Sequence, residues 1–224
     1  MTCRKVLVIA MDNEAAAVTA HFADVSESAV FGRRVIRGTF GGEPCAVVVA
    51  GIGKSNAAAA TQLALSLFEP EEVLNAGVAG ALHAPMQVAE VYQVRAAVQY
   101  DFDLAQLNGT AVGVLNEYDT PYLEVARFDI PAASGIRGWR TLATGDHFND
   151  SEADYDLIVS TLGATLRDME GGAIAHVCKR SGVPCHLVKC VSDVAGRGSM
   201  TGQFEQALRT CLKRLRCALE FLKD

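Results

Sequence analysis

The sequence predicts an α/β fold in which a central β-sheet is flanked by helices. Short, nearly continuous apolar runs, such as KVLVIAM (5–11), are typical of strands that are covered on both faces. Segments with helical spacing and helix-boundary residues separate these runs along the chain. With 224 residues, half of them hydrophobic, the chain can bury the core of one large domain, which we expect to span residues 1–224.

The first elements are a strand, a helix and a hairpin. After the strand at 5–11, DNEAAAVTAHF (12–22) is predicted to be a helix with Asp12 as its N-cap. The runs FGRRVIRGTF (31–40) and EPCAVVVAG (43–51) are joined by two glycines, which is a hairpin signal. We interpret the three arginines of the first run as a solvent-facing charged surface rather than as phosphate ligands.

The middle of the chain repeats the pattern of strand and polar segment. In residues 50–68 a glycine turn opens a helix, and residues 71–82 are predicted to be a strand that ends in a glycine-rich turn. Residues 88–109 should form a strand followed by an irregular polar segment. Residues 139–150 should form a strand that runs into a polar turn.

The last third contains the most informative stretch. ATLRDM (164–169) and CHLVKCVS (185–192) are predicted strands, and GGAIAHVCKR (171–180) is a predicted helix that ends at Gly182. Residues 201–224 have leucines at helical spacing and should form an amphipathic C-terminal helix with a basic outer face.

The composition argues against several classes of binding partner. The formal net charge of −6 offers no basic surface for nucleic acid and argues against binding to a membrane surface. No apolar run is long enough to span a bilayer, and the N-terminal run lacks a signal-peptide cleavage site. The seven cysteines include no C-x-x-C pair, so we expect a reducing, cytoplasmic location. The five histidines show no metal-ligand spacing, and neither a metal nor a cofactor is predicted.

Three acidic residues come shortly after three predicted strands: Glu14, Glu170 and Asp193. In an open α/β sheet, ligands bind at the carboxyl ends of the strands. Each acid taken alone could serve as a helix cap or compensate a helix dipole. Because three acids from three strands meet at one edge, capping is a weaker explanation, and we expect a small-molecule site there.

The same stretch carries a family resemblance. RDMEGGAIAHVCKRSGVP followed by VKCVSDVAG resembles the core signature of the bacterial 5′-methylthioadenosine/S-adenosylhomocysteine nucleosidases, within the wider nucleoside phosphorylase superfamily. Five further segments match in the same order: VLVIAMDNEAAAV, VVVAGIGKSNAAAATQLAL, NAGVAGAL, YDFDLAQLNG and ATGDHFND. The resemblance therefore covers nearly the whole chain. It implies a nucleoside phosphorylase-like fold with a mixed, partly barrel-like central sheet.

The resemblance also implies an activity and three catalytic roles. The implied reaction is hydrolysis of the N-glycosidic bond of 5′-methylthioadenosine and S-adenosylhomocysteine, which releases adenine. Asp193 matches the general acid at purine N7, and Glu14 matches the acid that activates the attacking water. Glu170 matches the residue that holds the ribose hydroxyls.

A set of substrate-binding residues follows from the same matches. Phe148 is expected to stack on the purine, while the backbone of Asn149 recognises the edge of the base. Met169 is expected to pack against the ribose. The remaining matches to pocket positions are Met11, Ile52, Val78, Ser192 and Phe204.

Two features leave the substrate and the assembly open. Val78 stands where many relatives have Ser or Thr, so a side-chain hydrogen bond is lost. This departure keeps another nucleoside, such as futalosine or a plain purine nucleoside, as an alternative substrate. Relatives pair as homodimers in which the partner subunit closes the 5′ pocket. The candidates for such contacts here are Tyr118, Pro121 and Tyr122, although these aromatics could equally pack within the chain.

The choice of nucleophile separates a hydrolase from a phosphorylase. Phosphorylases of the superfamily hold phosphate with a Gly-Asp-x-x-Arg type motif after the first strand, whereas this chain has Met-Asp-Asn-Glu at 11–14. An acid at that place repels phosphate and suits water, which favours the hydrolase. The alternatives are a phosphate-dependent phosphorylase and a non-catalytic nucleoside-binding protein on the same fold.

Overall fold

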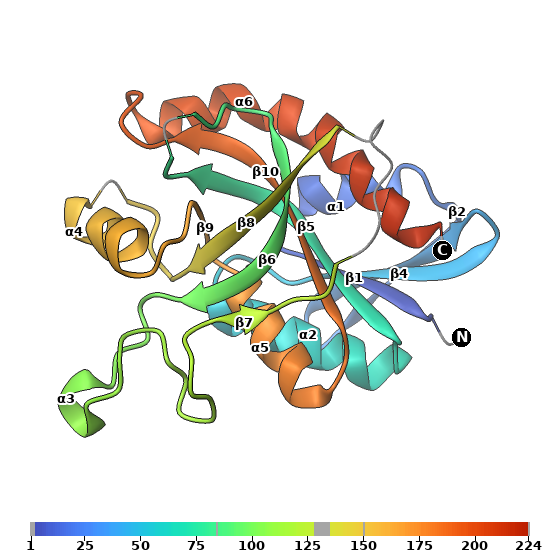
Figure 1. The fold of residues 1–224 in the computed structure, drawn as a ribbon. Coiled ribbons are helices and arrows are strands. Elements are labelled where there is room, and N and C mark those ends of the chain that lie inside the picture. Colours follow the sequence, from blue (N-terminus) through green and yellow to red (C-terminus); the bar gives the residue numbers. More distant parts are fainter. Residues whose placement is uncertain (1–2, 84, 128–134, 150, 224) are drawn as a thin grey trace.

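One mixed β-sheet runs through the centre of the molecule and carries helices on both faces (Figure 1). The structure is a computed structural model that describes residues 3–83, 85–127, 135–149 and 151–223. The strands are β1 Lys5–Ile9, β2 Ala23–Val30, β3 Arg33–Phe40, β4 Glu43–Val49, β5 Glu72–Ala81, β6 Val91–Gln99, β7 Leu123–Glu124, β8 Ile136–Thr144, β9 Leu166–Asp168 and β10 Cys185–Val194. The helices are α1 Asp12–Thr19, α2 Lys54–Phe68, α3 Ala105–Asn108, α4 Glu152–Asp156, α5 Gly171–Ser181 and α6 Met200–Leu215, with a π-helical turn at Leu157–Thr161 and a 3₁₀ segment at Arg216–Leu222.

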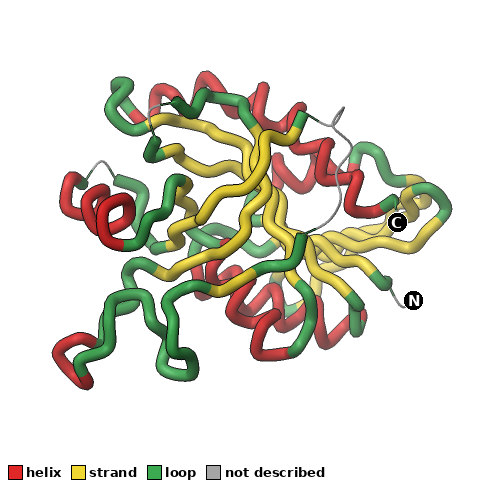
Figure 2. The backbone as a smooth tube through the Cα atoms, in the orientation of Figure 1, coloured by secondary structure: helices red, strands yellow, loops and turns green. Residues whose placement is uncertain are grey.

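Five strands pair in a closed circuit. β5 pairs with β9, β9 with β8, β8 with β6, β6 with β10, and β10 again with β5. From β5 the sheet continues as an open extension through β1, β4, β3 and β2. Figure 2 shows these strands as one continuous, strongly twisted sheet. The predicted α/β fold with a mixed, partly barrel-like sheet is confirmed.

The two faces of the open sheet bury two separate sets of apolar side chains. Because side chains alternate along a strand, Val6 and Val8 of β1 face one way and pack with α2 residues such as Ala60. Leu7 and Ile9 face the other way and join the core that contains buried residues of α1 and α6. Each fully buried aliphatic side chain of this kind stabilises the fold by about 1.5–3 kcal/mol. The near-continuous apolar run of β1 is thus explained by cover on both faces.

Two predicted boundaries around the sheet centre are wrong. The expected glycine-rich turn at 77–80 belongs to β5, because pairing with β10 and β9 keeps this segment extended as far as Ala81. Asp193 does not follow the last strand but lies within β10, since that strand stays paired with β5 through Val194. Long-range pairing, which local composition does not reveal, extends both strands.

The N-terminal part shows two further differences. Met11 is the N-cap of α1, so Asp12 is the first helical residue and not the cap. Strand β2 was not predicted, because its side chains are almost all exposed and show no apolar alternation. It pairs antiparallel with β3, and Arg34 on β3 forms ion pairs with Glu27 and Asp12 on the outer surface. The predicted hairpin of β3 and β4 is confirmed.

No helix within the described ranges combines the length and the apolar character that a membrane crossing needs.

Candidate active site

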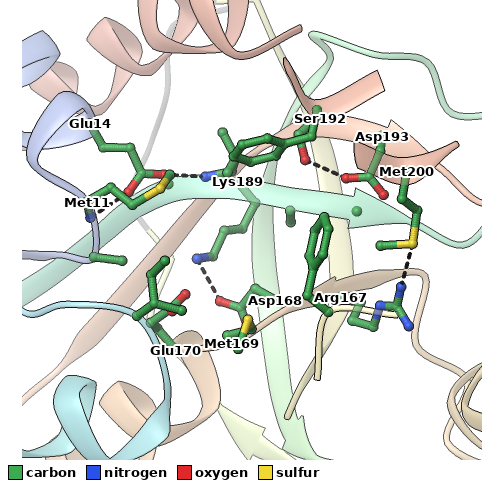
Figure 3. A pocket seen from close by; sticks show the side chains of 18 of the residues that line it. Met11, Glu14, Arg167, Asp168, Met169, Glu170, Lys189, Ser192, Asp193 and Met200 are labelled. Carbon is green, nitrogen blue, oxygen red and sulfur yellow. Dashed lines mark hydrogen bonds and ion pairs between the residues drawn. The ribbon is translucent and has the colours of Figure 1, made fainter. Parts of the chain in front are cut away.

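A cavity of about 510 Å³ opens beside the central strands β5, β9 and β10 (Figure 3). Residues from α1, from α6 and from the segment just before α5 complete its wall. All but one of the predicted catalytic and substrate-binding residues line this cavity: Met11, Glu14, Ile52, Val78, Phe148, Met169, Glu170, Ser192, Asp193 and Phe204. The exception is Asn149. Residues as far apart along the chain as Met11 and Phe204 are therefore gathered around one space.

Glu14 is fixed by the backbone at the start of α1. Its side chain accepts hydrogen bonds from the Met11 N–H at 3.1 Å and from the Val78 N–H at 2.9 Å. Val78 therefore contributes its backbone, not its side chain, to the contact with this acid. Burial raises the pKa of Glu14, although the two N–H donors and the positive charge of Lys189 oppose that rise. The result is a carboxyl group with one orientation and an increased affinity for a proton.

Glu170 stands at the N-cap position of α5 and faces the cavity. Its Oε1 accepts a hydrogen bond from the Gly53 N–H at 2.9 Å, which ties it to the glycine turn before α2. Burial and the negative charge of Asp168 raise the pKa of Glu170 to about 7, while Lys189 and Gly53 act against the rise. This acid can therefore change charge near neutral pH.

A buried ion pair, which we did not predict from the sequence, lies between these acids. The Lys189 Nζ is 2.7 Å from Asp168 Oδ2, and each side chain is only 1% exposed. Asp168 also accepts hydrogen bonds from the Thr144 hydroxyl at 2.6 Å and the Gly171 N–H at 2.8 Å. Burial alone would lower the pKa of Lys189, but the surrounding carboxylates raise it above its ordinary value. The lysine is thus a permanent cation held among acids.

The signal for this pair was present in the sequence. Lys189 interrupts the apolar run from Leu187 to Val191 within β10, and a lysine is almost never fully buried unless it has a partner. Asp168 lies at the end of β9, three residues before the start of α5. The sequence could therefore have suggested a buried partner for Lys189, but not its identity.

A bulge in β10 turns Asp193 toward the cavity. The register with β5 shifts between Val191 and Asp193, and Ser192 and Asp193 both line the wall although neighbours in a regular strand alternate. The Ser192 hydroxyl donates to Asp193 Oδ1 at 2.7 Å. Opposite, a Cβ on Gly80 would lie 2.8 Å from Asp193 Oδ2, so only glycine leaves room for the carboxyl group at this position.

Arg167 lies level with Gly80 and Asp193 on three neighbouring strands of the sheet. Gly80 pairs with Arg167 of β9 on one side and with Asp193 of β10 on the other. Arg167 is 8% exposed and lines the cavity. Its guanidinium donates to the Asn149 carbonyl at 2.5 Å, to the Asn149 side-chain oxygen at 3.3 Å and to Met200 Sδ at 3.3 Å. Asn149 is thus bonded to Arg167 but does not itself line the cavity.

Two aromatic rings from distant segments meet at the cavity. Phe148 follows β8 and Phe204 lies on α6, and their centroids are 6.1 Å apart in an edge-to-face arrangement. Phe148 is 52% exposed and Ile52, also on the wall, is 54% exposed. This side of the cavity presents large apolar groups to solvent.

Figure 3 separates the cavity into two ends. The carboxylate end contains Glu14, Asp168, Glu170 and Lys189. The arginine end contains Arg167, Ser192, Asp193 and Met200. A ligand that fills the space would contact acids at both ends and a cation at each. Among the described residues, no group of three or more His, Cys, Asp or Glu side chains is arranged to hold a metal ion.

The candidate dimer aromatics are engaged within their own chain. Tyr118 packs edge-to-face on His176 at 5.9 Å between centroids, with the Lys179 Nζ 4.4 Å from its ring. The Tyr122 hydroxyl donates to the Leu162 carbonyl at 3.0 Å. These contacts account for both rings, and a role at a subunit interface stays a prediction.

The fold and the acid-lined cavity define the class of protein. The family model described as "Phosphorylase superfamily" matches residues 4–223, and the chain is a member of that superfamily. A 5′-methylthioadenosine/S-adenosylhomocysteine nucleosidase of Marinomonas sp. (strain MWYL1) is 32% identical over 210 residues, covering 91% of this chain and 90% of the relative. The chain belongs to the family of the 5′-methylthioadenosine/S-adenosylhomocysteine nucleosidases and is an N-glycosidic hydrolase.

Solved structures agree with this assignment. The nucleosidase of this family from Colwellia psychrerythraea 34H, solved in complex with adenine, has a TM-score of 0.88 and 26% identity, with 99% of this chain and 95% of that chain covered. The futalosine hydrolase of Helicobacter pylori strain 26695 has a TM-score of 0.86 at 24% identity, with 100% and 97% covered. The second likeness concerns the fold alone.

Proposed function

We propose that this protein hydrolyses the N-glycosidic bond of 5′-methylthioadenosine and S-adenosylhomocysteine and releases adenine. The observation that carries the proposal is that Glu14, Glu170 and Asp193, from three distant segments, line one cavity. The named activity of relatives that cover nine-tenths of the chain supports the choice of substrates.

In the proposed reaction Asp193, in its protonated form, donates its proton to purine N7. The C1′–N9 bond then breaks, and its electron pair goes to the purine, which leaves as the neutral base. A water oxygen bonds to C1′ while Glu14 takes a proton from that water. The raised pKa of Glu14 supports this role, because a carboxylate with greater proton affinity is a stronger base. Return of the proton to Asp193 through solvent completes the cycle.

Glu170 is proposed to hold the ribose hydroxyls in its ionised form. A carboxylate at this place also favours the positive charge that develops on the ribosyl group in the transition state. Lys189 does not oppose that charge, because Asp168 lies 2.7 Å from its Nζ and neutralises it. Glu14 and Glu170 then leave the carboxylate end with a negative balance.

Water is proposed as the nucleophile rather than phosphate. The cations that line the cavity are Lys189, which is paired with Asp168, and Arg167, which lies at the other end. A phosphate beside Glu14 would also lie near Asp168 and Glu170 at the carboxylate end, and like charges in a buried site repel strongly. The carboxylate end thus suits a neutral nucleophile.

A homodimer in the cytoplasm is part of the same proposal, with the partner subunit closing the 5′ side of the pocket. The support is the pair of half-exposed apolar side chains on the cavity wall, Ile52 and Phe148, since such groups often mark a surface that another molecule covers. Sedimentation velocity at assay concentration tests the assembly. A fully active monomer would contradict it.

The experiment is an assay of adenine release from both thioether nucleosides in phosphate-free buffer, using the wild type and Asp193→Asn. The wild type should release adenine without phosphate, and Asp193→Asn should be slower by about a thousandfold because amide nitrogen is a poor proton donor. Asp12→Asn, which changes an exposed acid of the same helix α1 that pairs with Arg34 outside the cavity, serves as the control and should behave as the wild type. A strict requirement for phosphate would overturn the proposal.

A further inference from the structure

Arg167 is a buried cation at the cavity wall that the proposed chemistry does not use. Its side chain lines the arginine end, and within the described part of the chain no carboxylate forms an ion pair with it. Burying a charge costs free energy unless opposite charges or hydrogen bonds compensate for it, so the presence of an arginine here requires an explanation.

The hydrogen bonds of Arg167 leave part of its donor capacity unused. The guanidinium makes three hydrogen bonds, two to Asn149 and one to the weak acceptor Met200 Sδ. An arginine has five N–H donors, so two find no acceptor among the described residues. A ligand atom that fits this end of the cavity should therefore be a hydrogen-bond acceptor.

The position of Arg167 relative to Asp193 specifies which ligand atom that is. Both residues pair with Gly80, one from each side, so their side chains project toward the same face over a residue that has none. In the proposed reaction Asp193 meets purine N7. The group next to N7 on the same edge of a purine is the substituent at C6, which is an acceptor oxygen in 6-oxopurines and a donor amino group in adenine.

The two oxygens next to the guanidinium, both of Asn149, already accept hydrogen bonds from Arg167. The Asn149 carbonyl accepts the bond from Arg167, and the Asn149 amide bonds to Asp154 Oδ2 at 3.1 Å and to Arg167. A guanidinium has only donors and cannot accept from an amino group. In recognition of nucleic acids, arginine is the usual partner of the O6/N7 edge for the same reason.

We propose that Arg167 donates a hydrogen bond to O6 of the base and that this enzyme hydrolyses 6-oxopurine nucleosides in addition to 6-aminopurine nucleosides. This inference rests on the proposed function, because it uses the orientation of the base that Asp193 sets. The bond that breaks is again C1′–N9, water supplies the oxygen at C1′, and the released base is hypoxanthine where the substrate carries it.

The test uses two nucleosides that differ only at C6, 5′-methylthioadenosine and 5′-methylthioinosine. The kcat/KM of each is measured for the wild type and for Arg167→Leu, and the oxo-to-amino ratio is compared. The wild type should release hypoxanthine, and the ratio should fall at least about tenfold in Arg167→Leu. Arg167→Lys, which keeps a cationic donor, should retain more of the ratio than Arg167→Leu. Arg180→Leu, which alters an exposed arginine paired with Glu117, is the matched control.

A ratio separates base recognition from a general structural role of Arg167. Loss of the Asn149 contacts would lower both activities and leave the ratio unchanged, which would overturn the inference. Release of adenine without any release of hypoxanthine by the wild type would also overturn it, while the proposed function would stand. If the wild type cleaves neither nucleoside, the proposed function itself fails.

A second measurement needs no variant, in case Arg167→Leu does not fold. Free hypoxanthine and free adenine are compared as competitive inhibitors of the wild-type enzyme. Hypoxanthine should inhibit at least as strongly as adenine. Inhibition by adenine that is tenfold stronger would contradict a donor facing O6.

Discussion

The two ends of the cavity are held in place by different means. At the carboxylate end, Glu14, Glu170 and Asp168 each accept at least one backbone N–H, so their positions follow from the chain path itself. At the arginine end, Arg167 is held by contacts to Asn149 in a loop and to the side chain of Met200 on α6. The carboxylate end is therefore held by backbone groups of the fold, whereas Arg167 is held by one backbone carbonyl and by two side chains that a substitution can change.

This difference suggests a division of work within one site. Changes at the carboxylate end should affect the reaction and the stability of the fold together, because those groups are buried and mutually compensated. At the arginine end, changes of Arg167 and of the groups that hold it should mainly alter which base binds and how tightly, whereas Asp193 at the same end is the proposed general acid. The experiments below test this division, beginning with the largest expected effect.

Replacing Glu14 should show the strongest effect on catalysis. The Met11 and Val78 N–H groups donate to different oxygens of Glu14, so Glu14→Gln keeps an acceptor for only one of them and loses the ability to take a proton. We expect kcat to fall by about 10²–10⁴-fold, the range typical of a removed general base, with a small change in KM. Steady-state kinetics with 5′-methylthioadenosine measures this. A fall of less than tenfold would place the reactive acid elsewhere.

The charge of Glu170 should appear as a pH dependence of stability. Its pKa is raised to about 7 in the folded protein, above the ordinary value of 4.5, so the folded state binds its proton more tightly. The stabilisation from this group is present below about pH 4.5 and is lost as the pH rises through about 7. At 1.36 kcal/mol for each pH unit, the loss is about 3 kcal/mol.

The measurement is the free energy of unfolding by urea between pH 4.5 and 8 for the wild type and for Glu170→Gln. Gln carries no charge to bury. The free energy of unfolding of the variant should therefore increase relative to that of the wild type as the pH rises. Parallel curves would show that Glu170 titrates at its ordinary pKa, and the carboxylate end would then be less strained than its burial suggests.

The smallest effect should come from the aromatic side of the cavity. Phe148→Leu keeps an apolar side chain but removes the ring that is expected to stack on the base, and stacking contributes about 1–3 kcal/mol per base. We expect KM to rise about tenfold with kcat nearly unchanged. Phe31→Leu, which alters an exposed ring in the β2–β3 turn, is the control. A large loss of kcat in Phe148→Leu would contradict a role of this ring that is limited to binding the base.

Local sequence and the family resemblance together were sufficient to predict most of the sheet and its helices, and the segments that form the cavity. They failed where distant pairing decides the outcome. The segment at 77–80 has the composition of a turn, but it is a strand because β9 and β10 pair with β5. Lys189 and Asp168 are separated along the chain, and only the register of β10 and β9 brings them together. Likewise, nothing in the sequence around Asn149 indicates that Arg167 binds its carbonyl.

Strand β5 passes beneath both proposed reactive acids with two positions that lack a side chain. A Cβ on Gly77 would lie 3.0 Å from Glu14 Oε1, and one on Gly80 would lie 2.8 Å from Asp193 Oδ2. Three strand residues span about 10 Å. The spacing of these two glycines therefore determines how far apart Glu14, the proposed general base, and Asp193, the proposed general acid, can lie. An insertion or deletion between Gly77 and Gly80 would displace one clearance relative to the other. The length of this short segment thus sets the spacing of the two groups that are proposed to act at C1′ and at N7, on either side of the bond that breaks.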